Sequence, residues 1–482
     1  MDLEVLVRSH NPIIGVETVE ESRLDQLLHE IAWGANLPYF VWDCNKGLQR
    51  TPGSGAVYQT ADPKAAMDAV AEIESGLFLF RDLEDFLPDH TVERKLRDLV
   101  KGFGPQKTVV FVAQDEEAHQ DIRELLVYYA LPLPSTSELK ELLDGFVASI
   151  QGKARIELDE ADTARILDNL RGLTVFEAQR ALSQAVVAGN VLDKEDVRLL
   201  ANIKKRFIEK DNLVEYISPE DNFAIVGGLD NLKRWITKRK VAFAQNEFDL
   251  PAPKGVLMIG VPGCGKTLCA RAIANELRVG LIKLDPGRLY NKYIGESEAN
   301  LRKVLKMAES LAPVVLLVDE IEKVMPTGEQ SASDAGLGAR IFGTFLSWLQ
   351  DKGKPVFVVA TSNNIRALPP ELTRKGRFDE IFFVDLPDKR ARAVIFDIHL
   401  KRRKVDPATV NIAELTALTE GFSGAEIEEL ILSALYSVAG GAGPLTTELL
   451  REELKMSIPL SRRDAERVAE LRAWARANTI PA

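Results

Sequence analysis

Short, fully apolar runs alternate with longer helical patterns along most of the chain. In the C-terminal half these runs are Val256–Ile259, Leu281–Leu284, Val314–Val318 and Val356–Ala360. Strands without polar–apolar alternation are typical of a parallel sheet that helices cover on both faces. After Pro387 the apolar runs stop, and the pattern stays helical to the last residue. The pattern therefore predicts an α/β domain followed by a helical one.

The helical region after Pro387 contains an apolar stripe with a helix-start signal before it. Ser423 and Glu426 have the spacing of a capping box, in which each side chain bonds the backbone N–H of the other residue. We therefore expect a helix to begin near residue 424. Its stripe consists of Ile427, Leu430, Ile431, Ala434, Leu435 and Val438.

The N-terminal half repeats this layout. Its strand candidates are Ile13–Val16, Tyr39–Trp42, Leu77–Phe80 and Val109–Ala113. Helical patterns follow from about Ser137 to Lys204, with a second capping-box pair at Thr174 and Glu177. Landmarks in the two halves keep a nearly constant separation. We favour a duplicated module over a chance agreement between two common α/β layouts, with a junction at the charged segment Lys204–Asp211.

Composition and charge exclude several classes of protein. Of the 482 residues, 46% are hydrophobic and 28% charged, as in a globular multidomain protein. The formal net charge of −11 disfavours a general nucleic-acid binder. Three cysteines cannot form a disulfide framework and fit a reducing compartment. The start of the chain shows no secretory signal, and no apolar run approaches the ~20 residues of a membrane helix.

A phosphate-binding motif follows the strand candidate Val256–Ile259. Its glycines let backbone N–H groups turn toward a phosphate, and the helix N-terminus adds a favourable field. Lys266 would contact the β- and γ-phosphates of ATP, and the Thr267 hydroxyl would bind Mg²⁺. The alternative is a glycine-rich turn with an accidental lysine, which the strand–motif–helix context disfavours. The predicted nucleotide contacts are Gly260, Val261, Pro262, Gly263, Cys264, Gly265, Lys266, Thr267 and Leu268.

An acid pair ends the strand candidate Val314–Val318. Asp319 would hold the Mg²⁺ shell, and Glu320 would orient or deprotonate the attacking water. Alone, such a pair is usually a solvated strand end. The phosphate motif upstream favours the catalytic role.

These motifs together resemble the AAA+ ATPases, over roughly residues 221–460. The resemblance implies that Val226 and Gly227 contact adenine and that Asn363 helps to position the water. It also implies that Gly424 and Ala425 form the lid contact, with alanine where other clades have arginine.

The segment Leu372–Asp379 resembles the second region of homology of that family. The resemblance implies that Arg374 and Arg377 reach the γ-phosphate of the neighbouring subunit, where a guanidinium neutralises developing charge. Without this context, both arginines would be surface salt-bridge residues. With Ala425 at the lid, they would carry more of the charge stabilisation.

A further segment, Lys292–Glu298, is similar to the pore loop of the family's hexamers. In that case Tyr293, Ile294 and Gly295 would grip an extended polypeptide. The alternative is a tyrosine packed under a surface turn. The small, glycine-rich segment Ser331–Gly338 takes the place of the second pore loop and is predicted to be a mobile loop.

The first module lacks the corresponding chemistry. Arg23 takes the place of Lys266, and the glycines are gone. Asp82 takes the place of Asp319, with Leu83 at the catalytic glutamate. We predict an AAA-like module that has lost nucleotide binding and serves assembly or partner recognition. Arg23 and Glu17 are predicted to be ordinary surface charges.

The whole chain resembles an uncharacterised AAA-domain family first catalogued as a hypothetical chloroplast reading frame. We therefore expect a P-loop NTPase with a helical lid, preceded by the degenerate module. The predicted segments are a degenerate AAA-like α/β domain at 1–150, a lid-like helical segment and linker at 151–208, an AAA+ core at 209–388, and a lid with a C-terminal helix at 389–482. The strings that carry this resemblance are 77–83, 340–350, 368–372, 458–461 and 471–475.

The expected function is Mg²⁺-dependent ATP hydrolysis by a homo-hexamer or related ring that remodels or threads an unidentified protein. The alternative is a nucleotide-gated scaffold, and a motor on nucleic acid is disfavoured by the charge. We expect no membrane partner, and a cytoplasmic location, or the plastid stroma if the protein is plastid-encoded.

Overall fold

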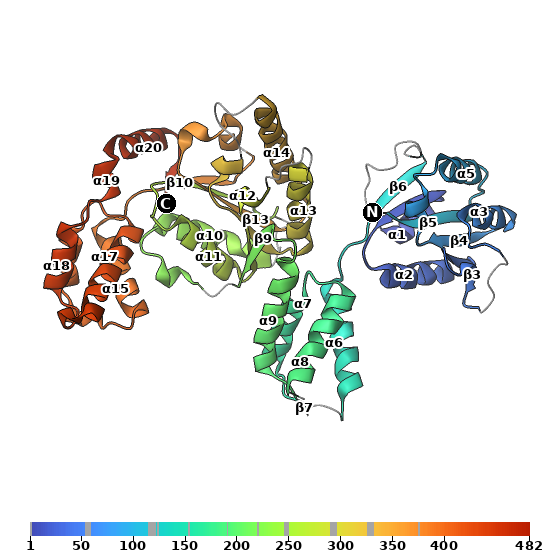
Figure 1. Ribbon diagram of the computed structural model, residues 1–482, viewed down its shortest axis with the longest axis horizontal. Helices are drawn as coiled ribbons and strands as arrows, with labels where there is room; N and C mark the ends of the chain where they lie inside the picture. The colour runs from blue at the N-terminus through green and yellow to red at the C-terminus, as the bar shows by residue number, and fades with distance from the viewer. Residues whose placement is uncertain are drawn as a thin grey trace. The chain divides into compact units, whose positions relative to one another are not determined.

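The chain divides into two compact units, Met1–Asp196 and Val197–Ala482 (Figure 1). The boundary falls within helix α9 (Lys194–Ile208), which runs into the charged segment where the sequence predicts the junction. Among the described residues, no helix is long and apolar enough to span a membrane. The computed structural model describes residues 2–53, 59–113, 122, 125–152, 155–189, 191–218, 221–244, 250–289, 296–324, 332–374 and 376–482.

The first unit is built on a six-stranded sheet with the order β3-β2-β4-β5-β1-β6. Every neighbouring pair is parallel except β2 and β3. The strands are β1 (Ile13–Glu17), β2 (Tyr39–Asp43), β3 (Gly47–Thr51), β4 (Gly76–Phe80), β5 (Lys107–Ala113) and β6 (Leu126–Ala130). The helices of this part are α1 (Leu3–Arg8), α2 (Glu21–Gly34), α3 (Pro63–Glu72), α4 (Leu83–Phe86) and α5 (His90–Lys101).

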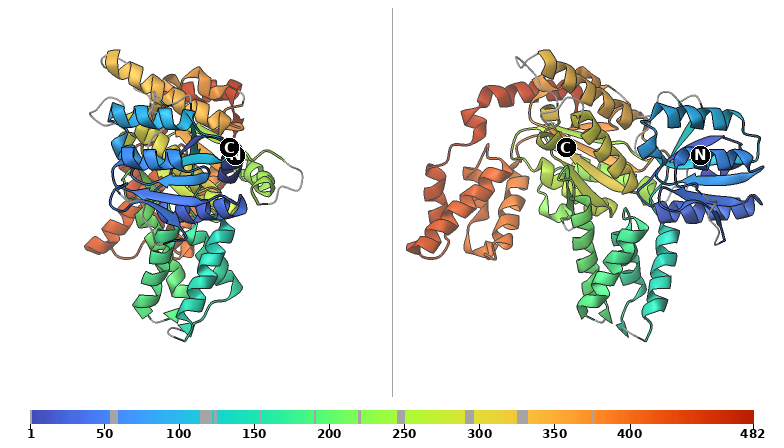
Figure 2. Two further views of the ribbon diagram at one scale, coloured as in Figure 1. Left: turned by 90° about the vertical axis from the view of Figure 1, so that its right-hand side faces the viewer. Right: turned by 45° about the vertical axis from the view of Figure 1, so that its right-hand side comes forward.

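Successive residues of these strands point into two separate cores. Ile13 and Phe78 pack with α3 and α5, whereas Ile14 and Leu77 pack with α1 and α2. Both faces of the sheet are therefore covered, as Figure 2 shows. This arrangement explains why the strands read as continuous apolar runs.

Three further helices complete the first unit: α6 (Thr136–Ile150), α7 (Glu160–Leu170) and α8 (Val175–Gly189). Helix α6 packs against α7 and α8. The predicted capping box before α8 is confirmed, because Thr174 N–H donates to Glu177 Oε2 at 2.9 Å and Glu177 N–H donates to Thr174 Oγ1 at 3.1 Å. A short parallel pair of strands belongs to the same part of the chain: β7 (Arg155–Ile156) lies between α6 and α7 in the sequence, and β8 (Val191–Leu192) follows α8.

The second unit contains a seven-stranded sheet with the order β15-β14-β10-β13-β12-β11-β9. Only the pair of β11 and β9 is antiparallel among its neighbouring pairs. The strands are β9 (Val214–Ile217), β10 (Gly255–Gly260), β11 (Gly280–Leu284), β12 (Val314–Val318), β13 (Val356–Ser362), β14 (Glu380–Val384) and β15 (Ile480–Pro481). The core helices are α10 (Asp230–Ala244), α11 (Lys266–Leu277), α12 (Pro286–Leu289), α13 (Glu296–Ser310) and α14 (Ala332–Asp351).

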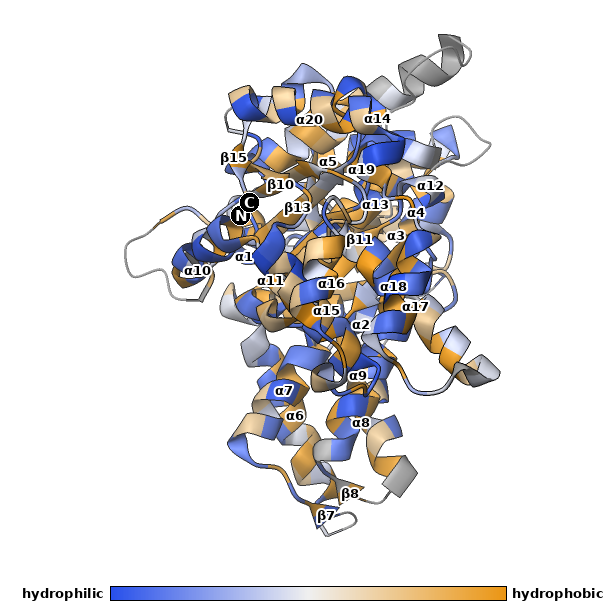
Figure 3. Ribbon diagram, turned by 90° about the vertical axis from the view of Figure 1, so that its left-hand side faces the viewer, coloured by the Kyte–Doolittle hydropathy of each residue, from blue (hydrophilic) through white to orange (hydrophobic). Residues whose placement is uncertain are grey.

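Helices again cover both faces of this sheet. Helices α10 and α11 pack on one face, and α13, α14 and α20 (Ala465–Asn478) pack on the other. In Figure 3 the strands β10, β11 and β13 are hydrophobic in colour along most of their length. The carboxyl ends of β10, β12, β13 and β14 therefore meet at one edge of a rigid sheet, where open α/β sheets bind ligands.

A helical lid follows β14. It consists of α15 (Lys389–Arg402), α16 (Ile412–Leu418), α17 (Gly424–Ser437) and α18 (Thr447–Lys455) around one apolar core. The predicted capping box at Ser423 and Glu426 is present at the start of α17. From the lid, α19 (Leu460–Arg463) and α20 lead the chain back to the core, as Figure 1 shows.

The two sheets share five strands in the same spatial order, β6-β1-β5-β4-β2 and β14-β10-β13-β12-β11. Each has one antiparallel strand beyond β2 or β11 at the same edge. The shared order agrees with the predicted duplication, and the eight predicted strands are present. The prediction that strands end before Pro387 is wrong, because the short strand β15 pairs with β14 at the very end of the chain.

Candidate functional site

The turn between β10 and α11 is a loop whose glycines hold conformations that other residues rarely adopt. Gly263 and Gly265 have φ angles of 75° and 83°, in the left-handed region that glycine enters without steric cost. A Cβ atom at Gly260 would lie 2.0 Å from the carbonyl oxygen of Val384 on β14. The motif's glycines are thus required by the backbone of this loop.

Lys266 is the first residue of α11, and its ammonium group is buried in the loop. Its Nζ donates hydrogen bonds to the carbonyl oxygens of Gly260 and Val261, each at 2.9 Å. Burial lowers the pKa of Lys266 to about 8, against the opposing effects of the Cys264 thiol and nearby acids. A phosphate group at this loop would offer the cation a charged partner. Lys266 therefore fits the predicted phosphate contact.

Asp319 directly follows β12 and accepts hydrogen bonds from neighbouring elements. Its Oδ1 accepts from Thr361 Oγ1 at 2.7 Å and from Thr267 Oγ1 at 3.1 Å, and its Oδ2 lies 3.2 Å from Lys283 Nζ. Burial raises the pKa of Asp319, but the hydrogen bonds and the Lys283 charge outweigh it and hold the pKa below its usual value. The carboxylate and the Thr267 hydroxyl are oxygen ligands of the kind that Mg²⁺ prefers. Sequence reasoning missed Lys283, which no motif marks. Thr361 begins the segment Thr361–Asn363 that resembles the family's first sensor, but the resemblance assigned a role to Asn363 and none to Thr361.

Glu320 has an unusual backbone and lies beside Asn363. Its φ of 54° is sparsely populated by residues with side chains, and its N–H donates to Thr361 Oγ1 at 2.9 Å. Asn363 Nδ2 donates to Glu320 Oε1 at 3.1 Å, and the other Glu320 oxygen pairs with Lys323. Asn363 Oδ1 is buried without a hydrogen-bond partner among the described residues. This oxygen can accept a hydrogen bond from a water molecule or a ligand.

These groups line one cavity of about 1520 Å³. Typical small-molecule sites hold about 300–1,000 Å³, so the cavity has room for a nucleotide. The loop residues Gly260, Val261 and Pro262 lie outside its described wall. The predicted residues in the wall are Val226, Gly227, Gly263, Cys264, Gly265, Lys266, Thr267, Leu268, Asp319, Glu320, Asn363, Gly424 and Ala425.

The lid closes one side of the cavity. Ala425 N–H donates to the carbonyl oxygen of Gly263 at 3.0 Å, which holds the start of α17 against the loop. A Cβ atom at Gly227 would lie 2.8 Å from Ile395 Cγ1 of α15. His399 of α15 also lines the cavity, and burial lowers its pKa against the charge of Glu428. Sequence reasoning missed Ile395 and His399 because α15 carries no motif.

Comparisons with known proteins identify the family. Residues 256–386 match the model of the ATPase family associated with various cellular activities (AAA), and residues 1–131 and 137–211 match the N-terminal and second domains of SpoVK-like AAA ATPases. The uncharacterised AAA domain-containing protein ycf46 of Guillardia theta is 36% identical, over 99% of this chain and 95% of that protein. The ycf46 protein of Trieres chinensis is 34% identical, over 99% of this chain and 97% of that protein.

The chain belongs to the ycf46 family of AAA domain-containing proteins. A cell division cycle protein 48 homolog of Archaeoglobus fulgidus is 31% identical, over 66% of this chain and 44% of that protein. The chain is therefore similar to other AAA proteins over part of its length.

The two arginines predicted to act on a neighbouring subunit lie outside the described wall of this cavity. Arg374 is exposed, and Arg377 Nη1 donates to the carbonyl oxygen of Leu346 at 2.5 Å. Asp379 Oδ2 accepts from Gly255 N–H at 2.9 Å, which fixes this segment to the start of β10. An arginine that acts in trans lies outside the cavity of its own chain, so the assignment stays a prediction.

The predicted pore residues Tyr293, Ile294 and Gly295 lie outside the described residues. Their role stays a prediction. The predicted second pore loop is wrong for residues 332–338, because α14 begins at Ala332. The small residues there allow a helix as well as a loop.

In the first unit, the loop after the first strand is shorter than the phosphate loop of the second unit. Three residues separate β1 from α2, whereas five separate β10 from α11. The three are Thr18, Val19 and Glu20, none of which is glycine. This loop lacks the length and the glycines of a phosphate cradle, in agreement with the predicted loss of nucleotide binding.

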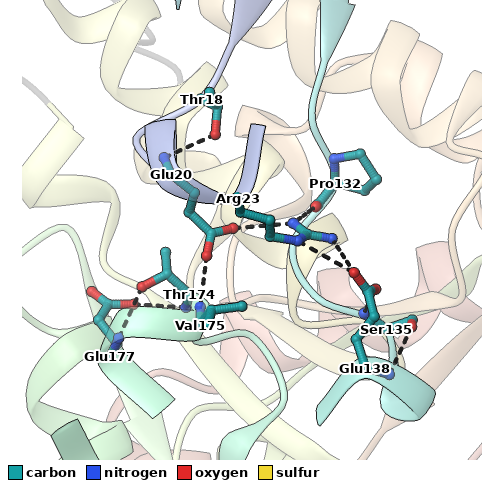
Figure 4. Close-up of polar contacts among 9 residues, drawn as sticks. All are labelled: Thr18, Glu20, Arg23, Pro132, Ser135, Glu138, Thr174, Val175 and Glu177. Carbon is teal, nitrogen blue, oxygen red and sulfur yellow. Dashed lines mark hydrogen bonds and ion pairs between the residues drawn. The ribbon is translucent and has the colours of Figure 1, made fainter. Parts of the chain in front are cut away.

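Two charged residues take the place of that cradle (Figure 4). Arg23 Nη1 lies 3.1 Å from Glu20 Oε2, and Nη2 lies 2.8 Å from Glu138 Oε1 of α6. Glu20 Oε1 accepts from Val175 N–H, at the start of α8, at 2.6 Å. The side chains of Arg23 and Glu20 are only 11% and 7% exposed. The prediction that Arg23 is an ordinary surface charge is therefore wrong.

The two residues that follow β4 in the first unit differ from the acid pair Asp319 and Glu320 of the second unit. Arg81 directly follows β4, as Asp319 directly follows β12, and Asp82 takes the place of Glu320. The predicted alignment of Asp82 with Asp319 is thus wrong by one residue. Arg81 Nη2 pairs with Asp25 Oδ2 at 2.9 Å, so a cation stands where a metal ligand would be needed.

Proposed function

We propose that the chain is a Mg²⁺-dependent ATPase whose subunits form a ring, and that hydrolysis drives the remodelling or threading of a protein partner. The observation that carries this proposal is the contact between Glu320 and Asn363 in the cavity lined by Lys266, Thr267 and Asp319. A carboxylate beside an amide, a buried cation and two oxygen ligands for Mg²⁺ fit the positioning and charge neutralisation on which ATP hydrolysis depends.

Each of these side chains would have a separate role. Lys266 would hold the phosphates, and Thr267 with Asp319 would hold Mg²⁺. When bound, Mg²⁺ would neutralise part of the phosphate charge. Glu320 would take the proton of the attacking water, while Asn363 would orient the Glu320 carboxylate and offer its free oxygen to that water.

The charge that develops during phosphoryl transfer would be stabilised by a neighbour. Arg374 and Arg377 would supply guanidinium groups in trans, which requires a homo-oligomer such as a hexamer or related ring. In the ring, Tyr293 would grip the protein partner. The three cysteines are free thiols, which fits the reducing cytoplasm or a plastid stroma.

A nucleotide-gated scaffold is the second candidate, and the first unit favours it. The Glu20–Arg23 pair joins the sheet of that unit to α6 and α8 without a nucleotide. A unit whose fold does not depend on a nucleotide could bind a partner in every nucleotide state of the second unit. In this candidate ATP would control assembly without continuous mechanical work.

Phosphate release by the full chain tests the proposed ATPase activity. We expect release that depends on Mg²⁺, rises per chain as the protein concentration favours rings, and is lost in Lys266→Ala. No release at any concentration would contradict the ATPase. Partners captured on an ATP-loaded Glu320→Gln chain then separate the two candidates. A remodelling enzyme would turn over faster with its captured partner, whereas a scaffold would bind the partner without faster turnover.

A further inference from the structure

The C-terminal segment, residues 460–482, forms a wall of the nucleotide cavity. It returns from the lid across the carboxyl edge of the core sheet, with β15 paired to β14. The residues of this segment that line the cavity are Arg472, Ala475, Arg476, Thr479, Pro481 and Ala482. They lie in the same cavity as the phosphate loop and the acid pair.

Several of the contacts that hold the segment in place do not involve its charged side chains. Leu471 and Ala475 of α20 are 2% and 4% exposed in the core of the second unit. Ala482 N–H donates to the carbonyl oxygen of Phe383 at 3.0 Å, and Asn231 Nδ2 donates to the carbonyl oxygen of Pro481 at 3.0 Å. A change of one arginine side chain on α20 therefore leaves these anchors intact.

Arg472 is fixed on this wall by an acid from the sheet. Its Nε donates to Asp385 Oδ1 at 3.0 Å and to Oδ2 at 2.9 Å. Asp385 directly follows β14, the strand that pairs with the phosphate-loop strand β10. Among the described residues, neither terminal nitrogen of Arg472 has a hydrogen-bond partner. They remain available to a ligand in the cavity.

The charge of Arg472 acts at the phosphate loop. Burial raises the pKa of the Cys264 thiol to about 12, and the carboxylates of Asp385 and Glu426 add to this rise, whereas the charges of Lys266 and Arg472 oppose it. Other arginines also line the cavity, namely Arg234, Arg390, Arg402 and Arg476. Arg472 is bound to Asp385 at the carboxyl end of β14, beside the phosphate-loop strand β10. The lid helix, which begins with Gly424 and Ala425, offers no cation at its start.

We propose that Arg472 binds the phosphate chain of the nucleotide and that Asp385 positions its guanidinium. The inference rests on the proposed function, because it assumes that ATP occupies this cavity. The phosphate chain is the anionic part of ATP, and a guanidinium forms strong charge-assisted hydrogen bonds with phosphate oxygens. The C-terminal segment thereby supplies a cation that the start of the lid helix α17 lacks.

The test measures nucleotide affinity in the full chain. Dissociation constants for ATP, ADP and adenosine are compared between the wild type and Arg472→Met, which keeps an unbranched apolar stem without the charge. We expect ATP and ADP to bind about 10- to 100-fold more weakly, as for one lost charge-assisted hydrogen bond, with adenosine unchanged within about twofold. Arg472→Lys should recover part of the loss, because it keeps the charge.

Arg366→Met is the matched control. Arg366 Nε pairs with Glu470 Oε1 of α20 at 2.7 Å, but Arg366 does not line the cavity. It should leave all three affinities unchanged. If Arg472→Met weakens adenosine as much as ATP, or leaves ATP binding unchanged, Arg472 has no contact with the phosphates. If the wild type binds neither ATP nor ADP, the proposed function fails with it.

Discussion

The guanidinium of Arg23 lies 3.1 Å from the carboxylate of Glu20, in the loop where the second unit has its phosphate cradle. The same carboxylate accepts the N–H of Val175 at the start of α8. A helix N-terminus attracts an anion. At the N-terminus of α8 this anion is the carboxylate of Glu20, so the chain itself provides the negative charge that a nucleotide phosphate could provide. The sheet of the first unit and its helices are thereby connected without a ligand.

Removal of this charge should loosen the first unit. Glu20→Gln leaves Arg23 with Glu138 as its one acidic partner and should lower the free energy of unfolding by about 1–3 kcal/mol, since both side chains are mostly buried. Hydrogen exchange in the full chain should show faster exchange at Val175 and through the start of α8. Glu4→Gln is the control, because the Glu4–Arg8 pair is 46% and 55% exposed, and it should change stability by less than about 0.5 kcal/mol. Equal effects of the two variants would contradict a buried connection.

The depressed pKa of Lys266 predicts a pH dependence of nucleotide affinity. In the empty site the lysine loses its proton near its pKa of about 8, whereas phosphate binding favours the charged form. Affinity for Mg-ATP should stay level below that pKa and fall about tenfold per pH unit well above it, with proton uptake on binding. Titration calorimetry in buffers of different ionisation enthalpy measures both quantities. Lys266→Arg keeps its charge throughout this range, so a fall of the same steepness in that variant would rule out Lys266 as the cause.

Thr361 connects the two acids of the site. Its hydroxyl donates to Asp319 Oδ1 and accepts the N–H of Glu320. Thr361→Val removes both hydrogen bonds at nearly constant volume and should reduce turnover about 10- to 100-fold, with a higher Mg²⁺ requirement. Thr361→Ser keeps the hydroxyl and should stay close to wild-type turnover. Equal losses in both variants would instead indicate a packing role for the methyl group.

The trans role of the two arginines predicts complementation between subunits. An Arg374→Ala/Arg377→Ala chain and a Lys266→Ala chain should each be nearly inactive, because a trans arginine can contribute about 10³–10⁵ in rate. A mixture should regain part of the ATPase activity at interfaces that join an intact cavity to intact arginines. Full turnover by dilute, monomeric protein or by the double-arginine variant would contradict this arrangement.

The strands that sequence reasoning located are those whose burial leaves a clear pattern. The runs at β10, β12 and β13 are apolar throughout because both faces of the sheet are covered. The edge strands β3 and β9 were missed, since residues such as Arg50 and Glu215 interrupt their apolar pattern. Strand β14 was also not predicted, although its apolar run Ile381–Val384 could have indicated a buried strand.

Within the site, sequence reasoning was limited to residues that a motif contains. The phosphate loop and the acid pair are local in sequence and therefore visible in it. Arg472 and Asp385 are 87 residues apart, and Arg23 and Glu138 are 115 apart. Nothing local marks such pairs, because their partners are chosen by the packing of distant elements. For this reason the sequence alone predicts that Arg23 is a surface charge.

The Glu320→Gln variant tests most directly whether this cavity hydrolyses ATP with Glu320 as the base. Binding stoichiometry and phosphate release are measured on the same preparation of full chain with Mg-ATP. We expect one bound ATP per chain, with an affinity within about threefold of wild type and a rate lower by about 10²–10⁴. One ATP per chain is expected because the first unit has no phosphate cradle. Hydrolysis by Glu320→Gln at the wild-type rate would contradict the account.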